Sequence, residues 1–340
     1  MSKKNSSVNL KNGFKDFKDL SDIFLNFKSR LDTLNKKNYL VAVSGGPDSL
    51  ALTALAKSYT YFKKIKFHYV LVDHNLRKNS NQEAQKVKNL LKKKQINLKV
   101  IINKKKINRN IQAEARIIRY NILLNYCKRN RITTILTAHN LEDQVETFFI
   151  RLSRGSGLKG LSAMKPLSKI DRQINLYRPL LDIKKFFLIK ISKNVFGKYF
   201  RDPSNKNKKF LRTKVRDLKK PLENSGVKYE QIFKSIQNLS LSRVTLDGYL
   251  SKIYKELINK KKNKEISIDF KKYNNLKNDT KIDLINEAVK QLKKNYYDLR
   301  SKKVQNLINI LNKKGFKKST LGGCIFFKKG ENLCLREEKL

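Results

Sequence analysis

A short apolar strand that breaks into a glycine-rich turn and then a helix constrains the fold of this chain more than any other feature. The run YLVAV at 39–43 is followed by SGGPDS at 44–49 and by the helix-forming run LALTALA at 50–56. An apolar run that ends in two glycines predicts a buried strand and a tight turn. A strand–turn–helix unit of this kind points backbone N–H groups and a helix N-terminus at a phosphate.

The six residues of this loop suit a nucleotide that carries a magnesium ion. Gly45 and Gly46 let the backbone approach closely, and Ser44 and Ser49 add hydroxyl donors. Asp48 would repel a phosphate unless a cation bridged them, which suggests Mg²⁺. The alternative is an ordinary strand-to-helix turn capped by Asp or Ser, which a lone SGG would favour. The six residues in this register favour a nucleotide loop.

Strand-like and helical patterns alternate over the first two-thirds of the chain. Strands are predicted at 39–44, 66–73, 98–102 and 133–137, a fifth at 176–180, and helices at 17–34, 48–62, 80–95 and 111–130. This alternation predicts an α/β fold with a parallel, doubly wound sheet. Beyond residue 217, lysine-rich helical stretches are predicted at 228–259 and 281–313, followed by a hairpin around 329–330. We therefore expect four segments: a lead and helix at 1–35, a catalytic domain at 36–217, a basic helical region at 218–318 and a terminal hairpin at 319–340.

The composition points to a polyanionic partner. Lys and Arg total 78 against 28 Asp and Glu, which gives a net charge of +50. Such a charge attracts nucleic acid by long-range steering. Biased coding would also raise the lysine count, but by itself it would not keep acidic residues so few. A membrane surface is the other polyanion, although we find no clean basic amphipathic anchor.

Cysteine usage and apolar runs predict a cytoplasmic protein. Cys127, Cys324 and Cys334 are the three cysteines and have no CxxC spacing, which argues against a disulfide framework and against a zinc or iron–sulfur site. The N-terminal residues lack the apolar core of a signal peptide. No apolar run approaches the ~20 residues of a membrane span.

Chemically suggestive residues follow the ends of three predicted strands, where parallel sheets bind ligands. The first group is the 44–49 loop, the second begins at Asp73 and His74, and the third at His139 and Asn140. Asp73 suits contact with a ribose or an adenine, as the acidic residue of the second strand does in other nucleotide folds. A simple turn is the alternative for this pair.

The segment that begins at His139 gives the second strong signal. Asn140 suits a helix N-cap, and Asp143 at the third helical position completes a local capping pair. Capping leaves His139 and Glu146 unexplained, and with Asp143 these two share one helix face at spacings of four and three. Their carboxylates suit Mg²⁺, and the imidazole suits donation to developing negative charge or transfer of a proton.

Two arginines of the predicted helix at 111–130 share a face at a spacing of three residues. Arg116 and Arg119 would ordinarily be solvated surface charges. Near an ATP site, however, arginine suits bidentate binding of phosphate and neutralisation of a leaving pyrophosphate.

Together these motifs resemble the bacterial tRNA(Ile)-lysidine synthases, a family of N-type ATP pyrophosphatases. The matching strings are SGGPDS at 44–49, VDHNLR at 72–77, QAEARIIRY at 112–120, TAHNLEDQVETFFIRLSRGSGLKGL at 137–161, RPLL at 178–181 and RDPSN at 201–205. The resemblance covers residues 36–216. It implies ATP and Mg²⁺, a tRNA(Ile) with a CAU anticodon and free L-lysine as partners, and a homodimer as a possible assembly. The implied product is lysidine, formed through an adenylated cytidine with release of AMP and pyrophosphate.

The same resemblance implies roles for individual residues. The ATP-binding set would be Ser44, Gly45, Gly46, Pro47, Asp48, Ser49, Asp73 and His74. The catalytic set would be Asp48, Arg116, His139, Asp143 and Glu146, with Asp48 and Asp143 as metal ligands. The sequence departs from the family pattern at Thr213, where the family usually has Asn, and its C-terminal part is shorter than in the longer members.

Two other functions remain open at this stage. A tRNA thiolase of the same superfamily would activate a carbonyl and insert sulfur, but those acting on cytidine carry paired CxxC motifs. A non-catalytic RNA-binding module built on a decayed loop is the alternative from another class. The presence of Asp48, His139 and Asp143 argues against it.

Overall fold

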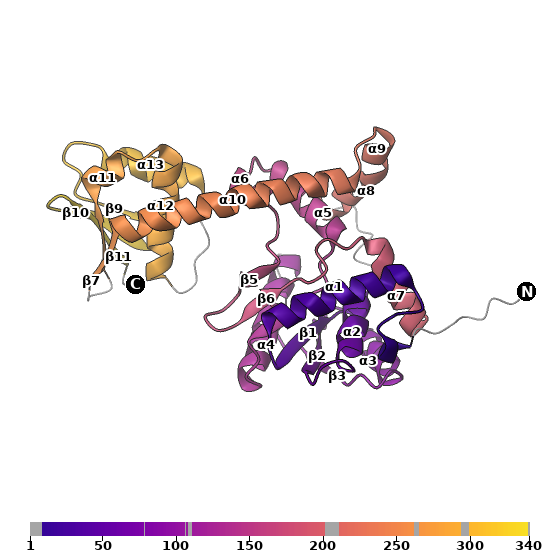
Figure 1. Cartoon of the computed structure of the whole chain (residues 1–340). Helices are drawn as coiled ribbons and strands as arrows, with labels where there is room; N and C mark the ends of the chain where they lie inside the picture. Colours follow the sequence, from indigo (N-terminus) through magenta and orange to yellow (C-terminus); the bar gives the residue numbers. More distant parts are fainter. Residues whose placement is uncertain are drawn as a thin grey trace, which may run out of the picture. The chain divides into compact units, whose positions relative to one another are not determined.

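The structure, a computed structural model, describes residues 9–77, 79–105, 107, 111–200, 211–261, 265–293 and 299–338. The chain forms two compact units, Met1–Ser240 and Leu241–Leu340 (Figure 1). The boundary falls within one long helix, α10 (Tyr229–Leu257). The boundary at residues 240 and 241 does not coincide with any boundary of the four segments expected from the sequence. The functions expected for those four segments remain predictions.

A six-stranded sheet forms the centre of the first unit, in the order β3-β2-β1-β4-β6-β5. Its strands are β1 (Asn38–Val43), β2 (Lys66–Asp73), β3 (Leu98–Ile102), β4 (Thr134–Leu136), β5 (Leu167–Lys169) and β6 (Asn175–Tyr177). Across the sheet, the neighbouring strands β3, β2, β1, β4 and β6 all pair in parallel. Strand β5 pairs antiparallel with β6 at the edge. The strand order reverses between β1 and β4, and in such sheets ligands bind beyond the carboxyl ends of the strands at this point.

Helices cover both faces of this sheet because β1 is apolar on both sides. Tyr39, Val41 and Val43 join one core, while Leu40 and Ala42 join the core on the opposite face. The first core also contains residues of α1 (Lys18–Leu34), α2 (Pro47–Tyr59), α3 (Ser80–Lys92) and α7 (Lys185–Phe196). The second contains residues of α4 (Ile111–Arg129). The predicted doubly wound sheet is confirmed.

The remaining helices of the first unit follow β4. They are α5 (Leu141–Leu152), α6 (Leu158–Leu161), α8 (Leu211–Asp217), α9 (Lys219–Asn224) and the start of α10. A short 3₁₀ helix at Leu10–Asn12 precedes α1 near the N-terminus. Apolar residues of α5 and of the first turns of α10 share a small core that includes Leu141, Val145, Tyr229 and Ile232. Strand β5 was not predicted, because a three-residue edge strand has too little pattern and depends on pairing with β6.

The second unit contains a five-stranded antiparallel sheet in the order β7-β8-β11-β10-β9. Its strands are β7 (Ile258–Lys261), β8 (Glu265–Asp269), β9 (Lys318–Leu321), β10 (Cys324–Lys329) and β11 (Asn332–Glu337). The unit also contains the helices α11 (Phe270–Asn274), α12 (Asn278–Leu292) and α13 (Ser301–Leu311). These helices share an apolar core with the sheet. The predicted hairpin is confirmed as β10 and β11, joined by a two-residue turn. Its pairing with β8 shows that it is part of a larger sheet.

Within the described ranges, no helix combines the length and the apolar character that a membrane crossing requires.

Candidate active site

The 44–49 loop lies at the carboxyl end of β1, as predicted, and opens α2 without a side-chain cap. The Ser49 hydroxyl accepts a hydrogen bond from the Ser44 backbone N–H at 3.1 Å and donates one to the Gly46 carbonyl at 3.0 Å. Gly46 is the N-cap and Pro47 the first residue of α2. The first N–H groups of a helix have no partner within it. An uncapped helix start of this kind suits an anion.

Gly45 is required at its position for two physical reasons. Its φ is +79°, a backbone conformation that side chains other than glycine rarely adopt. A Cβ atom there would lie 2.6 Å from Cγ2 of Val87 on α3. The Gly45 carbonyl also accepts a hydrogen bond from the Phe200 N–H at 3.0 Å. The loop is therefore fixed by close contact with α3 and with the segment after α7.

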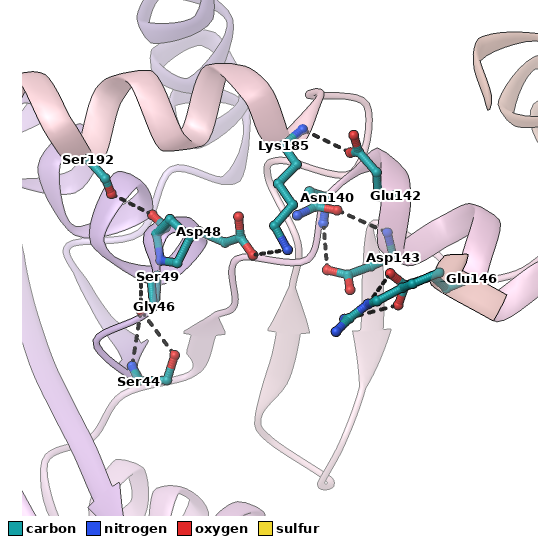
Figure 2. Close-up of polar contacts among 12 residues, drawn as sticks. Ser44, Gly46, Asp48, Ser49, Asn140, Glu142, Asp143, Glu146, Lys185 and Ser192 are labelled. Atoms are coloured by element: carbon teal, nitrogen blue, oxygen red, sulfur yellow. Dashed lines mark hydrogen bonds and ion pairs between the residues drawn. The ribbon is translucent and has the colours of Figure 1, made fainter. Parts of the chain in front are cut away.

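Asp48 points out of the first turn of α2 towards the Lys185 ammonium group (Figure 2). Its Oδ2 lies 3.8 Å from Nζ of Lys185, and its Oδ1 is buried without a hydrogen-bond partner among the described residues. The pKa of Asp48 is raised to about 6: burial is the largest cause and the nearby carboxylates of Asp143 and Glu142 add to the rise, while Lys185 and the Asn140 side chain oppose it. A cation at Oδ1 would relieve both the missing contact and the repulsion.

Helix α7 contacts the loop and the start of α5. Besides Lys185, it provides Ser192, whose hydroxyl donates a hydrogen bond to the Pro47 carbonyl at 2.9 Å. The Lys185 backbone N–H donates to Oε2 of Glu142 on α5 at 2.8 Å. Sequence reasoning missed Lys185, because a lysine in a chain with so many of them gives no signal of its own.

Asp73 and His74 lie at the carboxyl end of β2, also as predicted. Asp73 is 5% exposed, and its Oδ1 accepts the Asn75 N–H at 2.9 Å, which closes a local turn. Its Oδ2 is buried without a hydrogen-bond partner in the described part of the chain. Asn103, after β3, donates to the His74 carbonyl at 3.4 Å and to the Lys105 carbonyl at 2.7 Å. A pocket of about 240 Å³ lies here, lined by His74, Asn75, Leu76, Asn103, Lys104, Lys105 and Ile107.

The helix that follows β4 begins with the predicted capping box. The Asn140 side chain accepts the Asp143 N–H at 2.9 Å, and Asp143 Oδ2 accepts the Asn140 N–H at 3.2 Å. The local structural role of these two residues is thereby confirmed. The Asn140 side-chain amide nitrogen is buried and, within the described ranges, has no partner.

Asp143 and Glu146 pair with two arginines of α8. Arg212 contacts Oδ1 of Asp143 at 2.8 Å and Oε2 of Glu146 at 2.6 Å, and Arg216 contacts Oε1 of Glu146 at 2.6 Å. The Glu146 side chain is only 4% exposed. Sequence reasoning missed this pairing, although arginines spaced by four opposite acids spaced by three were a usable signal.

His139 lies beside this cluster as a neutral imidazole. Its Nδ1 is 2.9 Å from the Thr137 hydroxyl. Burial, together with the positive charges of Arg178, Arg116, Arg212 and Arg119, lowers the pKa of His139 to about 3. At neutral pH the imidazole can therefore donate a hydrogen bond, but it carries no positive charge of its own. Arg116 stacks on Tyr120, with 5.0 Å from its guanidinium carbon to the ring centroid.

The donor set around Asp48 fits a magnesium ion in part. Within the described ranges, no group of three His, Cys, Asp or Glu side chains could hold a metal ion. Mg²⁺ commonly takes one or two carboxylates together with substrate phosphates and water. Asp48 fits this pattern through its unpartnered Oδ1, whereas both oxygens of Asp143 already accept hydrogen bonds. The predicted RDPSN segment at 201–205 lies outside the described residues.

Comparison with known proteins places the chain in a family. Residues 20–221 match the family model of the PP-loop domain. The tRNA(Ile)-lysidine synthase of Wolbachia pipientis wMel is 32% identical over 302 residues, with 88% of this chain and 70% of the relative covered. That of Orientia tsutsugamushi is 38% identical over 221 residues, covering 64% of this chain and 49% of the relative.

A solved structure supports the fold alone. The U34-tRNA thiolase NcsA from Methanococcus maripaludis superposes with a TM-score of 0.54 at 18% identity, covering 65% of this chain and 79% of that one. The sheet order and the 44–49 loop both lie within residues 20–221, the part of the chain that matches the PP-loop domain. The chain thus belongs to the PP-loop domain family and, within it, to the tRNA(Ile)-lysidine synthases.

Proposed function

We propose that this protein ligates free L-lysine to C2 of the wobble cytidine of a tRNA(Ile) with a CAU anticodon. In the first step the cytidine O2 attacks the α-phosphorus of ATP, and pyrophosphate leaves. In the second step the lysine ε-amine attacks C2, loses a proton and displaces AMP. Both relatives named above are tRNA(Ile)-lysidine synthases, and this chain matches one of them over 88% of its own length.

One observation supports the proposal more than any other. The 44–49 loop and the segment from His139 to Glu146 meet at the order reversal of the sheet, where Asp48 has a buried oxygen without a partner in the described part of the chain. The phosphate loop lies beside a neutral imidazole, that of His139, whose pKa is lowered by burial and by several arginines. Such groups can stabilise the negative charge that develops on a phosphate and on a leaving group. The chemistry needs aligned donors and cations more than a general acid.

The loop would hold the phosphates of ATP and a magnesium ion. The N–H groups at the start of α2 and the hydroxyls of Ser44 and Ser49 would donate to phosphate oxygens. Asp48 would hold Mg²⁺ through Oδ1. The ion would neutralise phosphate charge and assist departure of pyrophosphate.

The remaining predicted residues divide into two groups. Asp73 and His74 would border the nucleoside of ATP beside the pocket at the ends of β2 and β3. Arg116, His139 and Asp143 would face the reacting centre, with His139 donating as a neutral imidazole. Glu146 would act as a positioning residue, because both of its oxygens hold arginines of α8.

The proposal includes partners and a location. The basic region at 218–318 would bind the tRNA, in keeping with the net charge of +50. A homodimer would provide a larger tRNA surface. We place the protein in the cytoplasm, where its tRNA substrate is found. The three cysteines are buried free thiols, which suits a reducing compartment.

The test is AMP release from ATP with tRNA(Ile) bearing a CAU anticodon, measured with and without free lysine. We expect AMP release that depends on free lysine, and labelled lysine that becomes attached to the tRNA. AMP release without attached lysine would overturn the choice of nucleophile and make sulfur the next candidate. Absence of AMP release with intact RNA binding would indicate a binding module instead.

A further inference from the structure

A buried arginine without a carboxylate partner lies at the carboxyl end of β6. Arg178 is 9% exposed, and its Nη1 donates to the Lys165 carbonyl at 2.7 Å and to the Ser168 hydroxyl at 3.0 Å. Its Nε is buried and has no hydrogen-bond partner among the described residues. These neutral acceptors satisfy part of the guanidinium but leave its charge uncompensated. A buried cation is costly unless an anion lies beside it.

Two further arginines lie at the same edge of the sheet. The Thr137 N–H donates a hydrogen bond to the Tyr177 carbonyl at 3.0 Å. Arg178 is the next residue after Tyr177, and His139 lies two residues after Thr137, so this hydrogen bond joins the two segments that carry them. Arg116 and Arg119 share one face of α4 at a spacing of three. Arg178, Arg116 and Arg119 each lower the pKa of His139, so all three positive charges act on the same imidazole. In the described part of the chain, no carboxylate forms an ion pair with any of the three.

We propose that Arg116, Arg119 and Arg178 form a second phosphate-binding site, which takes a phosphodiester of the RNA substrate next to the nucleotide that reacts. This inference rests on the proposed function for the identity of the RNA. The planar guanidinium groups suit bidentate contact with phosphate oxygens. Because Nη1 of Arg178 is already held by two acceptors, its side chain is fixed in advance and loses little entropy on binding.

Phosphate could reach these arginines from ATP or from RNA, and the sheet favours RNA. The 44–49 loop follows β1, whereas Arg178 follows β6, and β4 lies between these two strands. Two strand spacings amount to about 10 Å. The nucleoside pocket lies beyond β2, on the other side of β1. ATP placed between that pocket and the loop would end at β1, two strands short of Arg178, and this leaves the β4–β6 edge for the second substrate.

The test uses the full-length protein and full-length tRNA(Ile) that carries one methylphosphonate on either side of the wobble cytidine. The variants are Arg178→Gln and Arg119→Gln, and the control is Arg172→Gln, a charge-matched change at an exposed arginine of the same unit. RNA affinity is measured over a range of salt concentrations, and affinity for a non-hydrolysable ATP analogue is measured without RNA. Thermal unfolding of each variant checks that it is folded. If Arg178→Gln does not fold, the RNA affinity of Arg119→Gln alone tests the proposed phosphate site.

We expect both variants to bind unmodified tRNA at least about tenfold more weakly, with a log–log salt slope smaller by about one. The control and the affinity for the ATP analogue should change less than about twofold. One methylphosphonate should weaken binding to the unaltered protein but have little further effect on Arg178→Gln, because the two changes remove the same contact.

Two outcomes would overturn the inference. Loss of affinity for the ATP analogue with unchanged tRNA binding would assign the arginines to the triphosphate. Unchanged affinity for both ligands, or equal methylphosphonate effects in the variant and the unaltered protein, would make the cluster structural. If the unaltered protein binds RNA but attaches no lysine, the proposed function fails and the phosphate site is still tested by the same binding data.

Discussion

At the scale of the residue, the site depends on groups placed where they are costly to the fold. Gly45 adopts a positive φ against α3, and Asp48 has a buried carboxylate oxygen that lacks a partner among the described residues. His139 is kept neutral by its surroundings. Features of this kind persist where function requires them, because each is unfavourable for stability alone.

The first prediction concerns Gly45. Gly45→Ala should lower the free energy of unfolding by about 2 kcal/mol, because the new methyl group meets Val87 and the backbone is strained. It should also weaken ATP binding. Gly155→Ala is the matched control, since Gly155 has a φ of +66° but its new methyl group would have no atom within 4 Å. Chemical denaturation measures both, and equal losses would show that Val87 contributes nothing.

The second prediction concerns the pH dependence that Asp48 confers. Its pKa of about 6 implies that kcat/KM for ATP falls as pH drops below about 6, where the carboxyl group is protonated and no longer binds a cation. Stability should change in the opposite direction. The folded protein holds this proton more tightly than the unfolded chain, whose pKa is near 3.8, so raising the pH from about 4 to about 6 lowers the stability of the free protein.

Asp48→Asn supplies the control for both effects. It should abolish AMP release, and it should remove the part of the pH dependence of stability that lies between about pH 4 and about pH 6. Denaturation at several pH values, taken as the difference between the two proteins, measures the second effect. An Asp48→Asn protein with full activity would contradict the role of this carboxylate.

At the scale of the element, the site is built where helices start. Helix α2 begins at the phosphate loop, α5 begins at its capping box, and α7 begins where Glu142 accepts the Lys185 N–H. Helix α8 is tied to α5 through the pairs that Arg212 and Arg216 make with Glu146. The order of these elements around the sheet determines which side chains meet.

The third prediction tests the α5–α8 connection. Glu146→Gln should lower the free energy of unfolding by about 2 kcal/mol, because a buried partner of two arginines loses its charge. Glu83→Gln is the matched control, since Glu83 pairs with Arg77 at 3.2 Å while 46% exposed, and exposed pairs contribute at most about 1 kcal/mol. Equal losses in urea denaturation would refute a special role for Glu146.

At the scale of the whole molecule, the basic charge governs association with RNA. A net charge of +50 predicts a tRNA affinity that falls steeply with salt. The exposed side chains of Lys252 and Lys255 lie on the C-terminal half of α10, in the segment expected to bind tRNA.

The fourth prediction is that a Lys252→Gln and Lys255→Gln double variant binds tRNA more weakly and has a salt slope smaller by about two. Lys88 and Lys92 on α3 are also exposed, and the same changes there should leave the slope unaltered. Fluorescence anisotropy at several salt concentrations measures it. An unchanged slope in the first variant would remove this part of α10 from the RNA interface.

Much of the fold was predictable because the signals are local. The apolar runs defined β2 and β3 to the residue, and the turn chemistry placed the loop and the terminal hairpin. Strand β5 and the pairing of the hairpin with β8 were not predictable, because both depend on partners distant in sequence. Among the candidate site residues, the motifs pointed to Asp48, Asp73, His139 and Asp143; Lys185 was not singled out, and Arg178 entered only as part of the string RPLL at 178–181, without a role.

The sequence by itself determined the strand–loop–helix unit at 39–56, the parallel sheet and the residues at its carboxyl edge, since periodicity and turn residues act over short distances. Tertiary structure alone decided the electrostatics of the site. Burial raised the pKa of Asp48, burial and the charges of four arginines from three separate segments lowered that of His139, and Arg178 was left buried without an anion among the described residues. Burial and charge contacts join residues far apart in the chain, and no local pattern encodes them.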